Sequence, residues 1–294
     1  MKPLLSAVVP ISGSETKYSH LLNWLPKFES TLLEVILVGD SLSMLQQTAI
    51  QQVIRNGAKN QIQFINDSFG GPGTSRNAGM AEVQGNWICF WDCDDIPEIP
   101  NFIKMCKTAD ERGFNMSIGR FTSTDLLGDT KMSNRINTKW VSEEVVSNPG
   151  IWRTGFKHNL AEGLQFATHR MGEDQNFIQQ VEKRNPNKYF CDDFVYHYFR
   201  NRPDSLTSNQ NSIDDIRFVL KLSNSLLQEA PQSRMLQQAL VKQSITCLKR
   251  ASSKYRTTGL KLVVQFVKDH PWQSLVRLLP NIIRLLVFRF VTGR

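Results

Sequence analysis

The strongest structural signal in the chain is the stretch Trp87-Ile88-Cys89-Phe90-Trp91-Asp92-Cys93-Asp94-Asp95, in which a continuous apolar run ends directly in a cluster of acids. An apolar run of this length, without polar alternation, is typical of a strand covered on both faces of a parallel sheet. Ligands of such sheets bind beyond the carboxyl ends of the strands. The stretch therefore predicts a buried strand that carries its acids to a ligand-binding edge.

Similar apolar runs alternate with amphipathic stretches on both sides of this strand. The sequence predicts further strands over residues 5–11, 34–38, 61–65 and 115–118, and helices over residues 18–28, 43–56, 74–83 and 100–112. The pattern is less regular from about residue 120 to 200, and residues 205–252 are polar with helical periodicity. Alternating strands and helices at this spacing predict an α/β fold, with a mostly parallel sheet and helices on both faces.

The acidic cluster predicts a metal site. Asp92 and Asp94 stand one residue apart at the end of the strand, so their carboxylates can face the same cleft and repel one another unless a cation lies between them. Mn²⁺ or Mg²⁺ binds one or two carboxylates and completes its shell with water and phosphate oxygens. The alternative is a solvated loop whose acids cap the helix that follows.

A glycine-rich turn, residues 70–79, precedes the cluster. It lacks the Lys-Ser/Thr of a P-loop, and Arg76 stands where a dinucleotide fingerprint has its third glycine. One interpretation is a simple turn into a helix. The other is a backbone that approaches a substrate, with Arg76 offering its planar guanidinium.

Taken in order, these blocks resemble the family 2 glycosyltransferases of the GT-A fold, of the type that builds bacterial polysaccharides and lipid-linked oligosaccharides. The matching blocks are Ala7-Val8-Val9-Pro10, Glu34 to Ser41, Gly73 to Gly79 and Gly85 to Asp95. The resemblance covers roughly residues 4–208, and we expect a catalytic domain over 1–208 and a helical extension over 209–294 ending in a basic amphipathic helix. Two blocks depart from the family pattern, at Ile11-Ser12 and at Gly39-Asp40-Ser41.

The resemblance also implies roles for individual residues. Pro10, Asp40, Arg76 and Asp92 would contact the nucleotide-sugar donor, with Asp40 near the base. Asp92 and Asp94 would hold the metal and the diphosphate.

The acceptor side lies further along the chain. The resemblance makes Asp174 the general base that deprotonates the acceptor hydroxyl, with Glu173 as its neighbour, although acids also stabilise the first turn of any helix. His197 would contact the metal or the diphosphate, and the alternative is a histidine packed within an aromatic strand. Arg200 and Arg202 would close over the phosphates or lie in a solvated loop.

The C-terminal tail differs from the rest of the chain in charge. The whole chain of 294 residues carries +8, and from Lys249 onward ten basic residues face the single acid Asp269, so the preceding part carries −1. Residues 270–290 place His270, Arg277 and Arg284 on one helical stripe beside a wide apolar face, with Pro280 as a kink. Such a helix suits an anionic membrane surface. The alternatives are docking on the protein's own core or on a second subunit. Nucleic acid is not expected, because aromatic and basic residues do not interleave.

The remaining signals concern location. Five cysteines without a CxxC pair favour a reducing compartment over a disulfide framework. The apolar part of the N-terminus is too short for a signal peptide, and the stretch 275–291 is interrupted by arginines and Pro280, so neither predicts a membrane span. We expect a cytoplasmic protein that is peripheral at the inner face of the plasma membrane.

The combined hypothesis is an inverting, metal-dependent glycosyltransferase. It would move a sugar from a nucleotide-diphosphate donor to a hydroxyl of a glycan or lipid-linked acceptor, in surface polysaccharide biosynthesis. One alternative is a nucleotidyltransferase that makes nucleotide sugars, although the basic signature after the first strand is missing. Another is a catalytically silent scaffold that binds membrane through its tail.

Overall fold

A computed structural model describes residues 2–13, 18–27, 30–56, 61–125, 128–133, 150–169 and 172–200, together with single residues between 214 and 228. The chain divides into two compact units, the first formed by Met1–Val141 and Pro149–Ser208 and the second by Ser142–Asn148 and Asn209–Arg294. Most of the second unit, including the predicted basic helix, lies outside the described residues. The predicted helical extension therefore stays a prediction.

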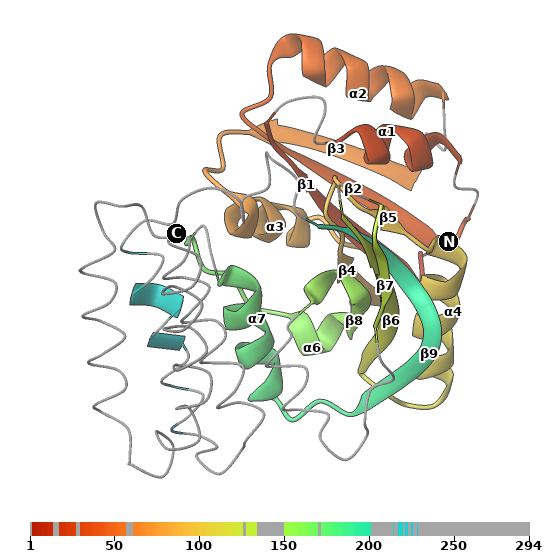
Figure 1. Ribbon diagram of the computed structural model, residues 1–294, viewed down its shortest axis with the longest axis vertical. Coiled ribbons are helices and arrows are strands. Elements are labelled where there is room, and N and C mark those ends of the chain that lie inside the picture. Colours follow the sequence, from red (N-terminus) through yellow and green to blue (C-terminus); the bar gives the residue numbers. More distant parts are fainter. Residues whose placement is uncertain are drawn as a thin grey trace, which may run out of the picture. The chain divides into compact units, whose positions relative to one another are not determined.

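The N-terminal half of the first unit alternates strands and helices as the apolar runs predict (Figure 1). Its elements are β1 (Leu5–Ile11), α1 (Ser19–Trp24), η1 (Leu25–Lys27), β2 (Leu33–Asp40), α2 (Met44–Asn56), β3 (Ile62–Asp67), α3 (Pro72–Met80), β4 (Trp87–Phe90), β5 (Ile96–Pro97) and α4 (Ile99–Glu111). The predicted helix over residues 18–28 becomes a short α-helix followed by a 3₁₀ turn, because Pro26 has no N–H to continue the α-helical bonding.

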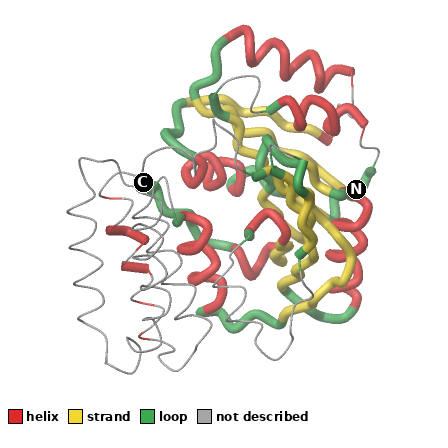
Figure 2. Tube along the Cα trace, viewed as in Figure 1, coloured by secondary structure: helices red, strands yellow, loops and turns green. Residues whose placement is uncertain are grey.

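The C-terminal half of the unit is less regular and mixes long strands with short ones (Figure 2). Its elements are β6 (Met116–Thr124), β7 (Thr130–Met132), η4 (Ile151–Arg153), β8 (Thr154–Lys157), α6 (His158–Ala161), α7 (Glu173–Glu182) and β9 (Lys188–Phe199). The longest of these strands, β9, has 12 residues and was not anticipated as a continuous element.

All the strands join one sheet of order β3-β2-β1-β4-β8-β6-β9-β5, with β7 paired to β6. The first four strands in that order are parallel to one another, as predicted from the N-terminal apolar runs. β8 is antiparallel to both β4 and β6, while β9 runs parallel to β6 and antiparallel to β5. The parallel strands thus end at one edge, and β9 reaches that edge from a later part of the chain.

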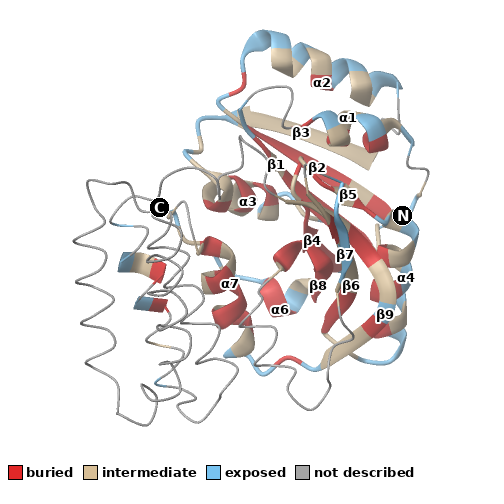
Figure 3. Cartoon of the chain, viewed as in Figure 1, coloured by how far each residue is buried: buried red, intermediate tan, exposed pale blue. Residues whose placement is uncertain are grey.

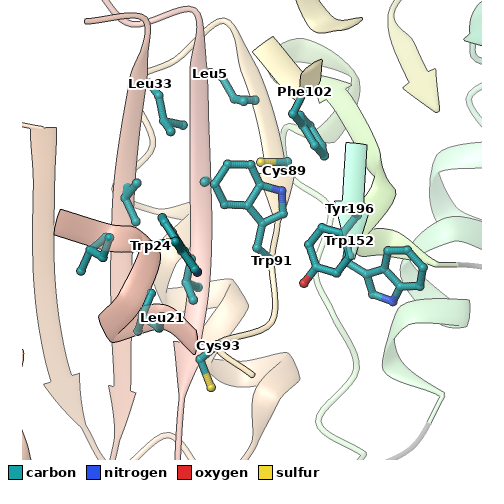
Figure 4. Close-up of a cluster of buried hydrophobic side chains, with 14 of the residues drawn as sticks. Leu5, Leu21, Trp24, Leu33, Cys89, Trp91, Cys93, Phe102, Trp152 and Tyr196 are labelled. Atoms are coloured by element: carbon teal, nitrogen blue, oxygen red, sulfur yellow. The ribbon is translucent and has the colours of Figure 1, made fainter. Parts of the chain in front are cut away.

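Helices cover both faces of the sheet, which confirms the predicted α/β class. On one face, alternate residues of β1 join a core with side chains from α1, α2 and α4 (Figures 3 and 4). On the other face, a Cβ added at Gly79 of α3 would lie 2.4 Å from Cγ1 of Val8, and Phe90 of β4 packs edge-on against Phe177 of α7. Among the described residues, no helix is long and apolar enough to span a membrane.

Candidate active site

The carboxyl ends of the parallel strands place several predicted residues along one edge of the sheet. Pro10 stands near the end of β1 opposite Val38 of β2, and Asp40 ends β2 opposite Asp67. The Val8 carbonyl accepts the Trp91 N–H at 3.1 Å, so the backbone of Val8 faces β4. The backbone nitrogen of Pro10, two residues later, faces the same side, but the pairing of β1 with β4 ends at Val8. A proline therefore interrupts no ladder bond at this position.

Asp40 shapes the glycine-rich turn that follows β3. Its Oδ1 accepts the N–H of Phe69 at 2.8 Å and the N–H of Gly70 at 3.0 Å. Gly70 and Gly71 have φ of 79° and 153°, in the region that favours glycine, and α3 begins directly afterwards at Pro72. Asp40 lies half-buried at the edge, and its contact with a nucleotide base stays a prediction.

Two glycines of the turn and helix are required by close packing within the protein. A Cβ on Gly73 would lie 2.2 Å from the Ala167 carbonyl oxygen, and Gly79 lies against Val8 as described above. The structure therefore gives the sequence Gly73 to Gly79 a packing role: it lets α3 lie close to the sheet and to the segment around residue 167.

The acidic loop, residues 92–95, follows β4. One carboxylate oxygen from each of Asp92, Asp94 and Asp95 lies within 4.8 Å of the others. The thiol of Cys93 between them is buried, and burial together with the charges of Asp94 and Asp92 raises its pKa well above the usual range. The loop thus offers carboxylate oxygens and no thiolate, a donor set that fits a hard divalent cation such as Mg²⁺ or Mn²⁺.

Arg76 on α3 connects this loop to α7. Its side chain is 4% exposed, with Nη2 at 2.7 Å from Oδ1 of Asp92 and Nη1 at 3.2 Å from Oε1 of Glu173 and 3.1 Å from Oδ1 of Asp174. Burial opposes the charged form, but the charges of Asp174, Asp92 and Glu173 raise the pKa of Arg76 above its usual range. Arg76 is therefore a buried cation between two acidic groups that are far apart in sequence.

The segment around Phe166 holds Arg76 in place. The side-chain amide of Asn77 donates to the Phe166 carbonyl at 3.0 Å, and its oxygen accepts the Phe166 N–H at 2.8 Å. The Phe166 ring lies 5.4 Å from the guanidinium carbon of Arg76. An aromatic face at this distance attracts a cation. Neither Asn77 nor Phe166 has a specific role predicted from sequence, because their pairing joins positions 89 residues apart.

Glu173 and Asp174 form the first turn of α7, after Gly172 at φ 85°. The Glu173 side chain is 10% exposed and that of Asp174 is 29% exposed. Burial and the charge of Asp174 raise the pKa of Glu173 to about 8, although Arg76 opposes the shift. Burial also raises the pKa of Asp174, again against the effect of Arg76. Asp174 is thus the better exposed of the two acids, and both hold a proton more readily than an ordinary carboxyl group.

His197 lies on β9, between Thr122 of β6 and Ile96 of β5. Its Nδ1 and Nε2 each lie 2.9 Å from a hydroxyl, of Thr122 and Thr124 respectively. Burial lowers the pKa of His197, and its ring centroid is 4.5 Å from that of Phe199. Since both ring nitrogens have hydroxyl partners, we leave His197 out of the metal site proposed below.

Arg200 also faces protein groups. Its Nη2 donates to the Asp129 carbonyl at 3.0 Å and lies 3.8 Å from carboxylate oxygens of Asp125 and Asp129. It thereby supports the turn between β6 and β7. Arg202 lies outside the described residues.

Comparison with known proteins agrees with this architecture. The family model described as glycosyl transferase family 2 matches residues 18–172, which is more than half of the chain. Poly(ribitol-phosphate) beta-N-acetylglucosaminyltransferase TarS of Staphylococcus aureus is 27% identical over 91% of this chain and 47% of its own length. EpsJ of Bacillus subtilis, an uncharacterized glycosyltransferase, is 24% identical over 70% of this chain and 64% of its own length. The chain thus spans about half the length of TarS and under two thirds of EpsJ.

Solved structures show the same fold. The crystal structure of S. aureus TarS residues 1–349 in complex with UDP-GlcNAc has a TM-score of 0.70 at 16% identity, over 93% of this chain and 83% of that chain. Mannosyltransferase PcManGT from Pyrobaculum calidifontis, in complex with GDP-Man and Mn²⁺, has a TM-score of 0.53 at 12% identity, over 100% of this chain and 84% of that chain. The expected GT-A fold is therefore confirmed, and the chain belongs to glycosyl transferase family 2.

Proposed function

We propose that the chain is an inverting glycosyltransferase of surface polysaccharide biosynthesis, which moves a sugar from a nucleotide-diphosphate donor to a hydroxyl of a glycan or lipid-linked acceptor. One observation carries the proposal. A single buried guanidinium, that of Arg76, lies 2.7 Å from Asp92 of the acidic loop and 3.1 Å from Asp174 of α7. It thereby brings a donor-binding carboxylate and a general base to the same site.

The donor side consists of the strand ends. Asp92 and Asp94 would hold Mn²⁺ or Mg²⁺, while Asp40 and Pro10 would line the nucleotide. A cation held there supplies positive charge to the departing diphosphate. The TarS structure contains UDP-GlcNAc, which makes UDP-GlcNAc the first donor to test.

Asp174 would accept the proton of the acceptor hydroxyl as its oxygen attacks the anomeric carbon. The C–O bond to the nucleoside diphosphate breaks on the opposite face, so the configuration inverts. The raised pKa of Asp174 suits this task, because a base is most effective when its pKa approaches the working pH. Glu173, which is more enclosed, would carry a proton and a hydrogen bond to Arg76.

Arg76 is predicted to contact the donor, but its contacts within the protein favour a positioning role. Its two terminal nitrogens already meet three carboxylates, so we assign Arg76 to holding Asp92 and Asp174 at a fixed separation. A guanidinium is suited to this, since its planar fork fixes the directions of the N–H groups that bind the acids.

The test is release of nucleoside diphosphate from a panel of nucleotide sugars in the presence of Mn²⁺. We expect one donor to be consumed by the wild-type protein and by Asp193→Asn, a matched control that removes an acid paired on the surface with Lys104. Asp94→Ala should lower consumption by about 10²–10³-fold. Equal consumption by Asp94→Ala and the wild type would contradict the proposal.

We further propose that the basic tail, residues 249–294, brings the enzyme to the inner face of the plasma membrane, where a lipid-linked acceptor would be found. The support is its charge, ten basic residues against one acid. Basic segments bind anionic lipids with an affinity that falls with salt. The full chain should co-sediment with vesicles containing phosphatidylglycerol at low salt, and much less with neutral vesicles. Equal sedimentation with both would contradict a charge-based attachment.

A further inference from the structure

Strand β9 lies against the whole acidic loop, although the contacting residues are 104 positions apart in the sequence. At one end of the loop, the hydroxyl of Tyr196 accepts the N–H of Asp92 at 2.9 Å. At the other end, the N–H of Phe199 donates to Oδ1 of Asp95 at 2.8 Å. β5 continues this contact, pairing Ile96 with His197.

Asp95 differs from the other two acids of the loop. Its side chain is completely buried, whereas Asp92 and Asp94 are half-buried. Its N–H also donates to the Asp92 carbonyl at 3.2 Å and closes the turn. A donor diphosphate must reach the cation from solvent, so the acids that share the cation with it should be the accessible ones.

Tyr196 is enclosed as firmly as Asp95. It is completely buried, and its ring stacks on Trp152 with centroids 4.8 Å apart and planes 22° apart (Figure 4). Burial, then the charges of Asp95 and Asp92, raise the pKa of Tyr196 well above its usual range. The hydroxyl therefore stays neutral beside the acids.

We propose that β9 is a template for the acidic loop, in which Tyr196 and Asp95 are positioning residues and Asp92 and Asp94 present the oxygens that bind a divalent cation. Tyr196 fixes the start of the loop and Asp95 fixes its end. That the ligand is a divalent cation rests on the proposed function. The template itself rests on the two hydrogen bonds between β9 and the loop.

The template can be tested without metal, by hydrogen exchange of the amides of residues 91–95 in the full chain with EDTA. Tyr196→Phe keeps the ring on Trp152 but removes the acceptor of the Asp92 N–H. We expect that amide to exchange about two- to tenfold faster, the range for one lost hydrogen bond. Unchanged exchange would overturn the template.

The matched control is Tyr189→Phe, which makes the same chemical change on the same strand. Tyr189 packs against Phe114 and Arg112, seven residues and roughly 20 Å along β9 from Tyr196. In Tyr189→Phe, the amides of the acidic loop should exchange at the wild-type rate. Equal acceleration by both variants would show a general loosening of β9 and would overturn a specific role for Tyr196.

A second measurement tests which acids of the loop are ligands and which are positioning residues. It follows Mn²⁺ binding in the presence of UDP by electron paramagnetic resonance of the free ion. Tyr196→Phe should bind Mn²⁺ about two- to tenfold more weakly. Asp95→Asn keeps an acceptor for the Phe199 N–H, so it should lose less affinity than Asp95→Ala or Asp94→Asn. If Asp95→Asn loses as much as Asp94→Asn, Asp95 is a ligand and the division is wrong.

The two measurements separate this inference from the proposed function. A wild-type protein that binds no Mn²⁺ would contradict the metal site and the assignment of Asp92 and Asp94 as ligands. The hydrogen-exchange result would then uphold or overturn the template by itself.

Discussion

The acidic loop and the first turn of α7 both place acids beside Arg76, yet these acids lie in different environments. Asp92 of the loop has a side chain 28% exposed, and its backbone N–H is held by Tyr196. Glu173 of the helix is 10% exposed, and burial with the charge of Asp174 raises its pKa to about 8. The loop is held through its backbone, whereas the helix turn encloses one of its two acids, Glu173.

This difference indicates a division of labour. Carboxylates fixed by their backbone and open to solvent can bind a cation together with the phosphates of a donor. Carboxylates with raised pKa values can accept or hold a proton near neutral pH. Arg76 joins the two groups, so changes on either side of it should produce separable effects.

The largest effect should come from the helix side. Asp174→Asn keeps the size of the side chain and its contact with Arg76 but removes the base, so transfer to the acceptor should fall by about 10²–10⁴-fold. Binding of the donor nucleotide should change little. Both can be measured on the same preparation, by single-turnover transfer and by calorimetry with UDP. An equal loss of transfer and of UDP binding would contradict separate roles for the helix turn and the acidic loop.

Substitution on the loop side should give the reverse pattern. Asp94→Ala should lower turnover by about 10²–10³-fold, the range for removing one electrostatic group at a charged transition state. Nucleotide binding should also lose its response to Mn²⁺. A titration of turnover with Mn²⁺ checks this, and a variant that remains fully active at the wild-type Mn²⁺ concentration would contradict the assignment.

A smaller effect is expected where α3, the helix that carries Arg76, meets the sheet. A Cβ at Gly79 would lie 2.4 Å from Val8 and 3.0 Å from Val38. Both neighbours are β-branched and stiff, so Gly79→Ala should lower the free energy of unfolding by about 1–3 kcal/mol. Urea denaturation measures it. No loss of stability would mean that α3 lies further from the sheet than the structure shows.

The smallest effect concerns pH. Because the folded-state pKa of Glu173 is raised to about 8 from an ordinary 4.5, the folded protein binds more protons than the unfolded chain between these values. The free energy of unfolding therefore falls as pH rises through that window. Below the window, Glu173 adds nothing to the pH dependence of stability.

Glu173→Gln should flatten this decline between pH 5 and 8 when melting temperatures are measured with EDTA. Glu111→Gln, at an acid whose side chain is 63% exposed, is the matched control and should retain the wild-type profile. An unaltered slope in Glu173→Gln would show that Glu173 is ionised in the folded protein throughout the range.

The sequence predicted the parallel half of the sheet well because each of its strands is a continuous apolar run followed by polar residues. β1 has the predicted bounds, and β2 and β4 differ from theirs by a few residues. β9 could not be anticipated in the same way. Large parts of β9 are half-buried, and its sequence mixes Asp192 and Asp193 with aromatic residues. It therefore shows neither a continuous apolar run nor a regular alternation of apolar and polar residues.

The candidate site was only partly accessible from sequence for a related reason. The motifs marked Arg76, Asp92 and Asp174, but spacing cannot show that the guanidinium of Arg76 reaches Asp174, 98 positions along the chain. His197 drew attention as a possible ligand, while the structural signal lay one residue earlier, in the hydroxyl of Tyr196. Contacts of this kind depend on how β9 is placed between β6 and β5, which local patterns do not encode.

The most direct test of the account is a thermal-shift measurement with UDP, GDP, CMP and dTDP, each with Mn²⁺ and with EDTA. A ligand that binds only the folded state raises the melting temperature. We expect one nucleoside diphosphate to do so with Mn²⁺, less so with EDTA, and not in Asp94→Ala. A wild-type protein with the same melting temperature in all these solutions would contradict a metal-assisted nucleotide-sugar site at Asp92 and Asp94.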